Sequence, residues 1–550
     1  MNPIFLLPYL SVLVLAFLLQ AAIEHGLERL NFLPKHSLSI TAWGLTTLMG
    51  YLTFWAYFGA YKLGWTFTCA LFLFVVVYWI RYRRDLRRTF WRVSDGHLCR
   101  FSMILIGAFY LGYLYLWQSP QAPEILAANR FMTSLPADNI IPAFLADRLA
   151  LGQSPKNFMG DWLSSDRPPL QTGFILLFRL PFDHWLGEPG PRAFAASLLF
   201  QLLWIPGLWA LLRGASARRA ETLAVVGLVA CTGFCLLHSV YTWPKLGAAG
   251  LVIGGASLFF DRSSSSQLVR WTIGSALCAL GYLGHGGVMF SLLALAPLTL
   301  LMRPNKTILA ASVTVFVLLL IPWSFYQNFY EPPGNRLIKW HIGGVIPVDN
   351  RGALETICTS YRETSGSEII KNKEANLAEL FRDGPWLLFK LSPSDIKGSR
   401  AAEFFHFFRG LGFGSWLLFF IPWCAWRLRG DKAATDMIHA ASLITGWGLL
   451  TLLVWVLLLF GPGTTIIHQG SLVPLLTLWT LPVVVLARWW RGSVIVVALA
   501  QLILFATIWT TPWSPPEGPL SMGALMLLLT SILLFGILTI VIHREPASEG

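Results

Sequence analysis

The chain has 550 residues, of which 55% are hydrophobic and 13% are charged, and its formal net charge is +13. A soluble globular domain carries roughly 25% charged residues, so this composition excludes an ordinary soluble enzyme and predicts an all-α polytopic membrane protein. The excess positive charge lies in short clusters between apolar runs, which is typical of cytoplasmic loops rather than of a nucleic-acid-binding face. We therefore expect membrane lipid as a partner and no nucleic acid.

The apolar runs follow one another at intervals that suit membrane-spanning helices of about 20 residues. The first run lacks a basic segment and a small-residue cleavage site, so we interpret it as a retained span and not as a signal peptide. We expect about 13–15 of the runs to cross the membrane. They lie near 4–23, 38–59, 65–80, 101–117, 192–212, 220–239, 244–260, 271–284, 287–302, 307–326, 411–426, 437–460, 470–487, 492–511 and 519–542.

Arginine and lysine gather in alternate connectors between these runs, as in RYRRDLRRTFWR (81–92) and RGASARR (213–219). The positive-inside rule places such connectors in the cytoplasm, so the other connectors, including the two larger outer loops at 118–191 and 327–410, face the periplasm. The run at 170–182 is about 13 residues long and is interrupted by Arg179 and Pro181. We interpret it as an interfacial or re-entrant helix, because it is too short to span.

This pattern divides the chain into four parts. Residues 1–100 hold three N-terminal spans and a basic cytoplasmic loop, and residues 101–326 hold a core of spans with the first outer loop. The long outer loop at 327–410 and the C-terminal spans at 411–550 follow. Five of the seven cysteines lie in apolar runs and no paired spacing occurs, so neither a disulfide framework nor a zinc knuckle is predicted.

Ionisable residues gather in the outer connectors, and ionisable groups beside a bilayer are functional candidates by default. Asp138 begins a predicted amphipathic surface helix, PADNIIPAFLADRLALG (136–152), where it is either the N-cap or a functional carboxylate. Lys245, in VYTWPKLG, is either an interfacial anchor with Tyr241 and Trp243 or a phosphate ligand. Both alternatives stay open for each residue.

The order of motifs in the first outer loop resembles that of membrane glycosyltransferases of the GT-C superfamily. Asp138 precedes the amphipathic helix, Gly152 follows it, and DW (161–162) and DRPP (166–169) come next. The resemblance is to the polyprenyl-phosphate-sugar-dependent type, which includes protein O-mannosyltransferases, aminoarabinose transferases and bacterial arabinofuranosyltransferases. It covers the first outer loop, and the remaining chain as topology alone. The three N-terminal spans are additional to the usual family core, and Asn139 stands where the family often has a second acidic residue.

The resemblance implies a GT-C-like bundle in the bacterial inner membrane that moves a sugar from a polyprenyl-phosphate donor to a periplasmic glycan, lipid or protein, such as a pilin. That reaction needs a carboxylate to take the acceptor proton and cations to neutralise the leaving phosphate. By resemblance, Asp138 is the general base and Asp166 a second catalytic carboxylate. The donor phosphate is assigned to Arg167, Lys245, Arg336 and Lys339. The substrate contacts are assigned to Asp161, His285, His341 and His468.

Three other functions stay open, one of which is a non-catalytic scaffold or assembly subunit, since a fold alone does not guarantee activity. An O-antigen-ligase or polymerase type of enzyme would use the long outer loop at 327–410. A lipid or sugar transporter or flippase would place charges deep inside the spans and repeat helix sets in inverted order. The predicted spans are nearly free of charge, which favours the transferase. The residues require no particular cofactor; a divalent metal ion is an alternative for which His285, His468 and Asp166 offer nitrogen and oxygen ligands.

Overall fold

The computed structural model describes residues 3–86, 94–131, 135, 137–156, 159–160, 162–179, 189–261, 265–347, 349–382, 399–400, 403, 406–418, 426, 432–461, 472–489, 491–511 and 518–544. Helices make up the regular structure of these residues, and extended pairing is limited to two isolated bridges, Trp117 with Leu520 and Met159 with Trp162. The predicted all-α class is therefore confirmed.

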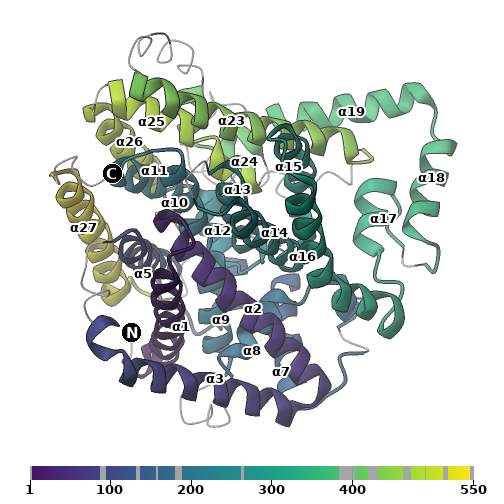
Figure 1. The fold of residues 1–550 in the computed structure, drawn as a ribbon, viewed down its shortest axis with the longest axis horizontal. Coiled ribbons are helices and arrows are strands. Elements are labelled where there is room, and N and C mark those ends of the chain that lie inside the picture. Colours follow the sequence, from purple (N-terminus) through teal and green to yellow (C-terminus); the bar gives the residue numbers. More distant parts are fainter. Residues whose placement is uncertain are drawn as a thin grey trace.

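The first half of the chain contains four long helices, then short helices of the first outer loop, then a compact core (Figure 1). The long helices are α1 (Pro3–Leu30), α2 (Leu38–Gly59), α3 (Tyr61–Arg81) and α5 (Asp95–Leu114). The loop contains α6 (Pro123–Arg130), α7 (Ile141–Ala150) and α8 (Leu170–Leu177). The core contains α9 (Pro189–Gln201), α10 (Trp204–Gly214), α11 (Arg219–Ala230), α12 (Gly233–Val240), α13 (Lys245–Phe260), α14 (Gln267–Gly284), α15 (Met289–Leu301) and α16 (Lys306–Phe325).

The second half begins with the long outer loop and ends with further apolar helices. The described part of the loop contains α17 (Arg336–Gly343), α18 (Ala353–Glu363), α19 (Gly366–Phe381) and α21 (Phe407–Gly410). The C-terminal helices are α23 (Lys432–Leu458), α24 (Leu472–Thr477), α25 (Thr480–Trp489), α26 (Arg491–Thr510) and α27 (Met522–Arg544). Of the run expected at 411–426, the structure describes residues 411–418 and 426.

Eight of the described helices are long and apolar enough to cross a membrane, or nine if the bent pair α11–α12, with a 72° bend, counts as one span. The chain is therefore a multi-pass membrane protein. The expected total of about 13–15 spans stays a prediction, because α13 and α15 are apolar helices of 16 and 13 residues that are shorter than a standard span.

Ion pairs join several of the basic connectors, and the alternation of helix directions places the others with them, at one end of the bundle called here the basic end. Asp95, the first residue of α5, accepts hydrogen bonds from Arg213 (3.2 Å) and Arg219 (2.9 Å), which flank the turn between α10 and α11. Asp261, after α13, accepts one from Arg270 of α14 at 3.0 Å. The connectors between the basic ones lie at the other end, called here the site end.

The three N-terminal helices follow the same alternation. Glu24, near the end of α1, pairs with Arg100 of α5 at 2.7 Å, so α1 ends at the basic end and begins at the site end. His36, just before α2, lies 4.0 Å from Asp261 at the basic end. Helices α2 and α3 then meet at Ala60, which is at the site end.

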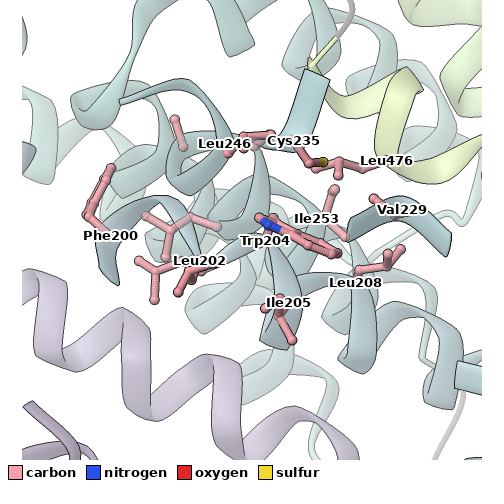
Figure 2. Packing of buried hydrophobic residues seen from close by; sticks show 14 of the residues in the cluster. Phe200, Leu202, Trp204, Ile205, Leu208, Val229, Cys235, Leu246, Ile253 and Leu476 are labelled. Atoms are coloured by element: carbon pink, nitrogen blue, oxygen red, sulfur yellow. The ribbon is translucent and has the colours of Figure 1, made fainter. Parts of the chain in front are cut away.

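The core is tightest where α10 crosses α13. A Cβ atom at Gly207 would lie 2.1 Å from the carbonyl oxygen of Gly250, and one at Gly250 would lie 2.4 Å from that of Leu203. Such small residues let membrane helices approach closely, and dispersion contacts then stabilise the crossing. Figure 2 shows Trp204 of α10 packed among aliphatic side chains that include Ile253 of α13.

In the run at 170–182, residues Leu170–Leu177 form α8, and all eight residues of this helix are buried. Gly173 faces α2, where a Cβ atom would lie 2.2 Å from the carbonyl oxygen of Gly50. Helix α8 therefore packs on α2 inside the protein, as a re-entrant helix would, and does not lie on its outer surface. Because α8 is inside the bundle, the residues just before it, 162–169, are held against the ends of several spans.

Candidate functional site

Asp138 forms the centre of a buried cluster at the site end. It lies in a 3₁₀ turn, Ala137–Ile140, and helix α7 begins after Ile140 without a side-chain cap. The carboxylate instead pairs with Arg167 and accepts a hydrogen bond from the indole nitrogen of Trp243 at 2.9 Å. The N-cap interpretation of Asp138 is therefore wrong, and its carboxylate points toward the start of α13.

Trp162 joins this pair to the long outer loop. The guanidinium carbon of Arg167 lies 4.7 Å from the centre of the Trp162 ring, and that of Arg336 lies 5.1 Å from it. Both distances are within cation–π range. Arg336 also lies 3.8 Å from the carboxylate of Asp166. Two carboxylates and two arginines, drawn from loops about 170 residues apart in sequence, therefore surround one tryptophan.

Lys245 is the third cation of the cluster. Its side chain is 3% exposed, and its ammonium lies 3.4 Å from the ring centre of Trp243, the residue that donates to Asp138. Among the described residues we find no hydrogen-bond acceptor for this ammonium. A buried ammonium without an acceptor is costly unless a ligand or water supplies one. Lys245 is therefore available to bind an anionic ligand, and in this structure its ammonium contacts the ring of Trp243.

The turn between α12 and α13 has an unusual backbone conformation that positions Trp243 and Lys245 in the cluster. Thr242 has φ +58°, an uncommon value for a β-branched residue. Its carbonyl oxygen accepts a hydrogen bond from Gln171 of α8 at 2.9 Å. The buried helix α8 therefore holds the turn in place, and Trp243 and Lys245 follow from it directly.

Glu331, which the sequence analysis did not single out, anchors the turn that carries Asp166. Its carboxylate accepts a hydrogen bond from the hydroxyl of Ser164 and one from the backbone nitrogen of Ser165 at 3.0 Å. Gln327 donates to the carbonyl oxygen of Ser165 at 3.1 Å. The sequence feature that could have identified Glu331 is an acidic residue directly after a predicted span and before two prolines, in YEPPG (330–334).

Asp166 is buried at the foot of this turn. One carboxylate oxygen accepts the backbone hydrogen of Leu163 at 3.0 Å, and Arg336 lies on the same side. Burial raises the pKa of Asp166 above its ordinary value, although the Leu163 hydrogen bond and the nearby arginines oppose the shift. A carboxyl group with a raised pKa is a stronger proton acceptor once ionised.

Lys339, assigned to the donor phosphate, is engaged inside its own loop. Its ammonium donates to the carboxylate of Asp349 at 2.5 Å and to the carbonyl oxygens of Asp349 (2.9 Å) and Arg351 (3.3 Å). These contacts close the segment that follows α17. Lys339 therefore has a structural role here, and the long loop contributes Arg336 to the cluster instead.

His285 also belongs to the cluster. Its Nδ1 atom accepts the backbone hydrogen of Gly287 at 3.0 Å, which puts the ring hydrogen of the neutral form on Nε2. Burial lowers the pKa of His285, and Lys245, Arg167 and His341 are close enough to lower it further. His341 is buried and stacks on Trp340 at 4.8 Å. Two other predicted substrate contacts, Asp161 and His468, lie outside the described residues.

No three His, Cys, Asp or Glu side chains within the described ranges come together as a metal-binding group. The cluster instead carries cations: Arg167, Arg336 and Lys245 around Trp162 and Trp243. Three buried or half-buried cations beside two carboxylates suit a doubly charged phosphate better than a divalent metal ion.

No family model, curated protein or solved structure matches the chain. The fold and the apolar helices define its class, a multi-pass all-α membrane protein with a buried charged cluster at one end of its bundle.

Proposed function

We propose that the chain is an integral-membrane glycosyltransferase of the GT-C type. It would take a sugar from a polyprenyl-phosphate donor and transfer it to an extracytoplasmic glycan, lipid or protein acceptor. The site end would face the periplasm of a bacterial cell, because the basic connectors are at the other end and the positive-inside rule assigns them to the cytoplasm.

The observation that carries this proposal is the Lys245 ammonium, which is buried beside the Asp138–Arg167 pair and has no hydrogen-bond acceptor among the described residues. A leaving phosphate would supply that acceptor. Arg167 can then bind the phosphate through two parallel hydrogen bonds, which the planar guanidinium favours. Arg336, across the Trp162 ring, adds a third positive charge from the long outer loop.

Phosphate binding also has a consequence for Asp138. When Arg167 turns to the phosphate, the carboxylate keeps its hydrogen bond from Trp243 and gains a lone pair for the acceptor hydroxyl. The acceptor oxygen then bonds to the anomeric carbon, the bond from that carbon to the phosphate oxygen breaks, and polyprenyl phosphate leaves with the electron pair. The hydroxyl proton passes to Asp138. Asp166 would orient the acceptor or Arg336 from its position on the 164–166 turn.

The test is transfer from polyprenyl-phosphate sugars in proteoliposomes of the full chain, with binding of polyprenyl phosphate measured separately. We expect Arg167→Ala to lower turnover by roughly 100- to 1,000-fold, since lost charge stabilisation at a leaving group has that magnitude. Arg167→Lys should recover part of the lost turnover, because lysine keeps the positive charge but cannot form two parallel hydrogen bonds to the phosphate. Arg382→Ala is a control, since Arg382 is an exposed arginine of the long outer loop that lies outside the cluster. Unchanged transfer in Arg167→Ala would refute the phosphate role.

A transporter is the second candidate, and a specific feature favours it. Helices α11 and α12 break with a 72° bend, and Gln501, midway along α26, donates to the carbonyl oxygen of Cys231 at the break (2.6 Å). Buried Glu403 accepts a hydrogen bond from Trp509 (2.8 Å), with Arg409 4.0 Å away. Broken helices with buried charges are common at transporter sites.

Proteoliposomes distinguish the two candidates. A transporter moves a labelled polyprenyl-phosphate sugar between leaflets without any acceptor, and Glu403→Gln should abolish that movement. If the chain is a transferase, we expect the labelled lipid to move between leaflets no faster than in protein-free vesicles. We also expect release of the sugar to require both the acceptor and Asp138.

A further inference from the structure

A large cavity lies at the basic end, well away from the Asp138 cluster. Its volume is about 1910 Å³. Its walls come from α5, α11, α26 and α27, which lie side by side in Figure 1, and its mouth is formed by the connectors near Lys35, Asp95 and Arg218. None of the residues assigned to the glycosyltransferase site lines it.

The walls of the cavity are apolar stripes of four helices. Lining positions recur every three or four residues, as expected for one face of each helix. They include Leu105, Ile106 and Phe109 on α5, Leu223, Gly227 and Leu228 on α11, and Ile532, Phe535 and Gly536 on α27. On α26, the lining residues Ile495 and Leu499 are 63% and 54% exposed. The cavity therefore opens sideways, toward the bilayer interior.

The mouth of the cavity is charged: four basic and four acidic side chains line it, and Arg100, paired with Glu24, adds a fifth cation. Lys35 and Arg218 are exposed and have no ion pair among the described residues. Two arginines, Arg213 and Arg219, share the single carboxylate of Asp95.

The acidic lining residues are largely engaged with other groups. Glu24 pairs with Arg100, and Glu221 accepts the backbone hydrogen of Arg218 at 2.7 Å. Glu28 is exposed at the same rim, so two acidic side chains, Glu28 and Glu221, lie with Lys35 and Arg218 at the mouth. Five cations and four carboxylates thus surround the mouth, a net charge of +1 that favours an anionic headgroup, and the wall below it accepts hydrocarbon.

We infer that this cavity is a binding site for an anionic phospholipid of the leaflet at the basic end. The phosphate would lie between Lys35 and Arg218, and the acyl chains would follow the stripes of α5, α11, α26 and α27. Basic pockets between membrane helices on the cytoplasmic side are where anionic headgroups bind. This inference depends on the cavity and its charges alone. It is therefore independent of the glycosyltransferase proposal, in which the donor phosphate binds at the opposite end of the bundle.

The headgroup half of the site is tested by lipid binding to the purified full chain. The measurement is competition between phosphatidylglycerol and phosphatidylcholine, read by native mass spectrometry in detergent. We expect phosphatidylglycerol to bind roughly 10- to 30-fold more tightly, the effect of two cations beside a headgroup. The double variant Lys35→Gln with Arg218→Gln should remove this preference. Arg303→Gln with Lys306→Gln is the control, since both residues are exposed in a basic connector outside the cavity.

The hydrocarbon half is tested by filling the cavity. Gly536 lines it, and a Cβ atom there would meet no other atom within 4 Å. Gly536→Leu should therefore fold normally and lower the number of phospholipids retained through purification. Gly446→Leu is the matched control, because Gly446 of α23 has the same free space and does not line the cavity. Thermal unfolding shows whether each variant is folded.

Three results would overturn the inference. Equal binding of the two phospholipids would remove the headgroup site, and equal lipid retention in the Gly536→Leu and Gly446→Leu variants would remove the cavity as the site. Displacement of bound phosphatidylglycerol by polyprenyl phosphate at equal concentration would show that the occupant is the isoprenoid lipid instead.

Discussion

The Asp138 carboxylate accepts hydrogen bonds from Arg167, Trp243 and Tyr241, and an asparagine oxygen can still accept from the last two. In Asp138→Asn the amide oxygen still accepts from Trp243, so we expect the protein to fold and to bind polyprenyl phosphate. Loss of the proton acceptor should lower turnover by roughly 10²–10⁴-fold. The measurements are transfer and thermal unfolding of the same preparation. Wild-type turnover in the folded variant would assign the base to another carboxylate, and Asp166 would then be the nearest alternative.

Asp166 predicts a pH effect on stability. Its pKa is raised in the folded protein, so its contribution to stability is fully present below the unfolded value of about 3.9 and is lost as pH rises through the folded pKa. Asp166→Asn removes that ionisation, while its amide oxygen can still accept from Leu163. We therefore expect the variant to gain thermal stability relative to the wild type between about pH 4 and pH 8. A relative loss over that range would mean that the Arg336 ion pair dominates.

Several site residues could be predicted from the sequence, and others could not. Asp138, Asp166, Arg167 and Lys245 were identifiable because charged residues next to apolar runs are rare and have few structural reasons to be there. The partner of each charge was not predictable. Lys339 looked equivalent to Arg336 in sequence, yet its ammonium pairs with Asp349. Which of these two neighbouring cations faces the cluster depends on its position around helix α17 and on the fold of the segment after that helix.

At the scale of the helices, the crossing of α10 and α13 is the contact most sensitive to size. A methyl group at Gly250 would lie 2.4 Å from the carbonyl oxygen of Leu203, which is backbone and cannot rotate away. We expect Gly250→Ala to destabilise the protein by about 1–3 kcal/mol, the usual cost of overpacking a core. Gly446→Ala should be neutral or slightly stabilising, since nothing lies near its Cβ position. Thermal unfolding of the two variants measures the difference, and equal midpoints would contradict the close crossing.

Helix positions were largely predictable, because an apolar run of about 20 residues has few alternatives to a spanning helix. The placement of short elements was not. Helix α8 has the composition of an interfacial segment, and it is internal because Gly173 fits against Gly50 of α2. The break between α11 and α12 at Cys231 and Thr232 was also not predictable, because no proline lies in either helix or between them. Such features arise from contacts between distant parts of the chain.

For the whole molecule, the orientation in the membrane is testable with a native cysteine. Of the cysteines that the structure describes, Cys358 alone is exposed, and it lies on α18 in the long outer loop. We expect a membrane-impermeant maleimide to label Cys358 from the periplasmic side of intact cells. Cys358→Ser should remove the label, and a cysteine placed at exposed Ser216, at the basic end, should react after permeabilisation alone. The reverse pattern would invert the topology and move the candidate site to the cytoplasm.

The central claim is that the Asp138 cluster receives a polyprenyl phosphate, and this can be tested without knowing the sugar or the acceptor. The most direct measurement is a cryo-electron microscopy map of the full chain with polyprenyl phosphate. The account predicts density for the phosphate within hydrogen-bond distance of Lys245 and Arg167, with Arg167 turned away from Asp138. A map of bound polyprenyl phosphate with the Asp138–Arg167 pair intact and its phosphate elsewhere, for example in the cavity at the basic end, would contradict it.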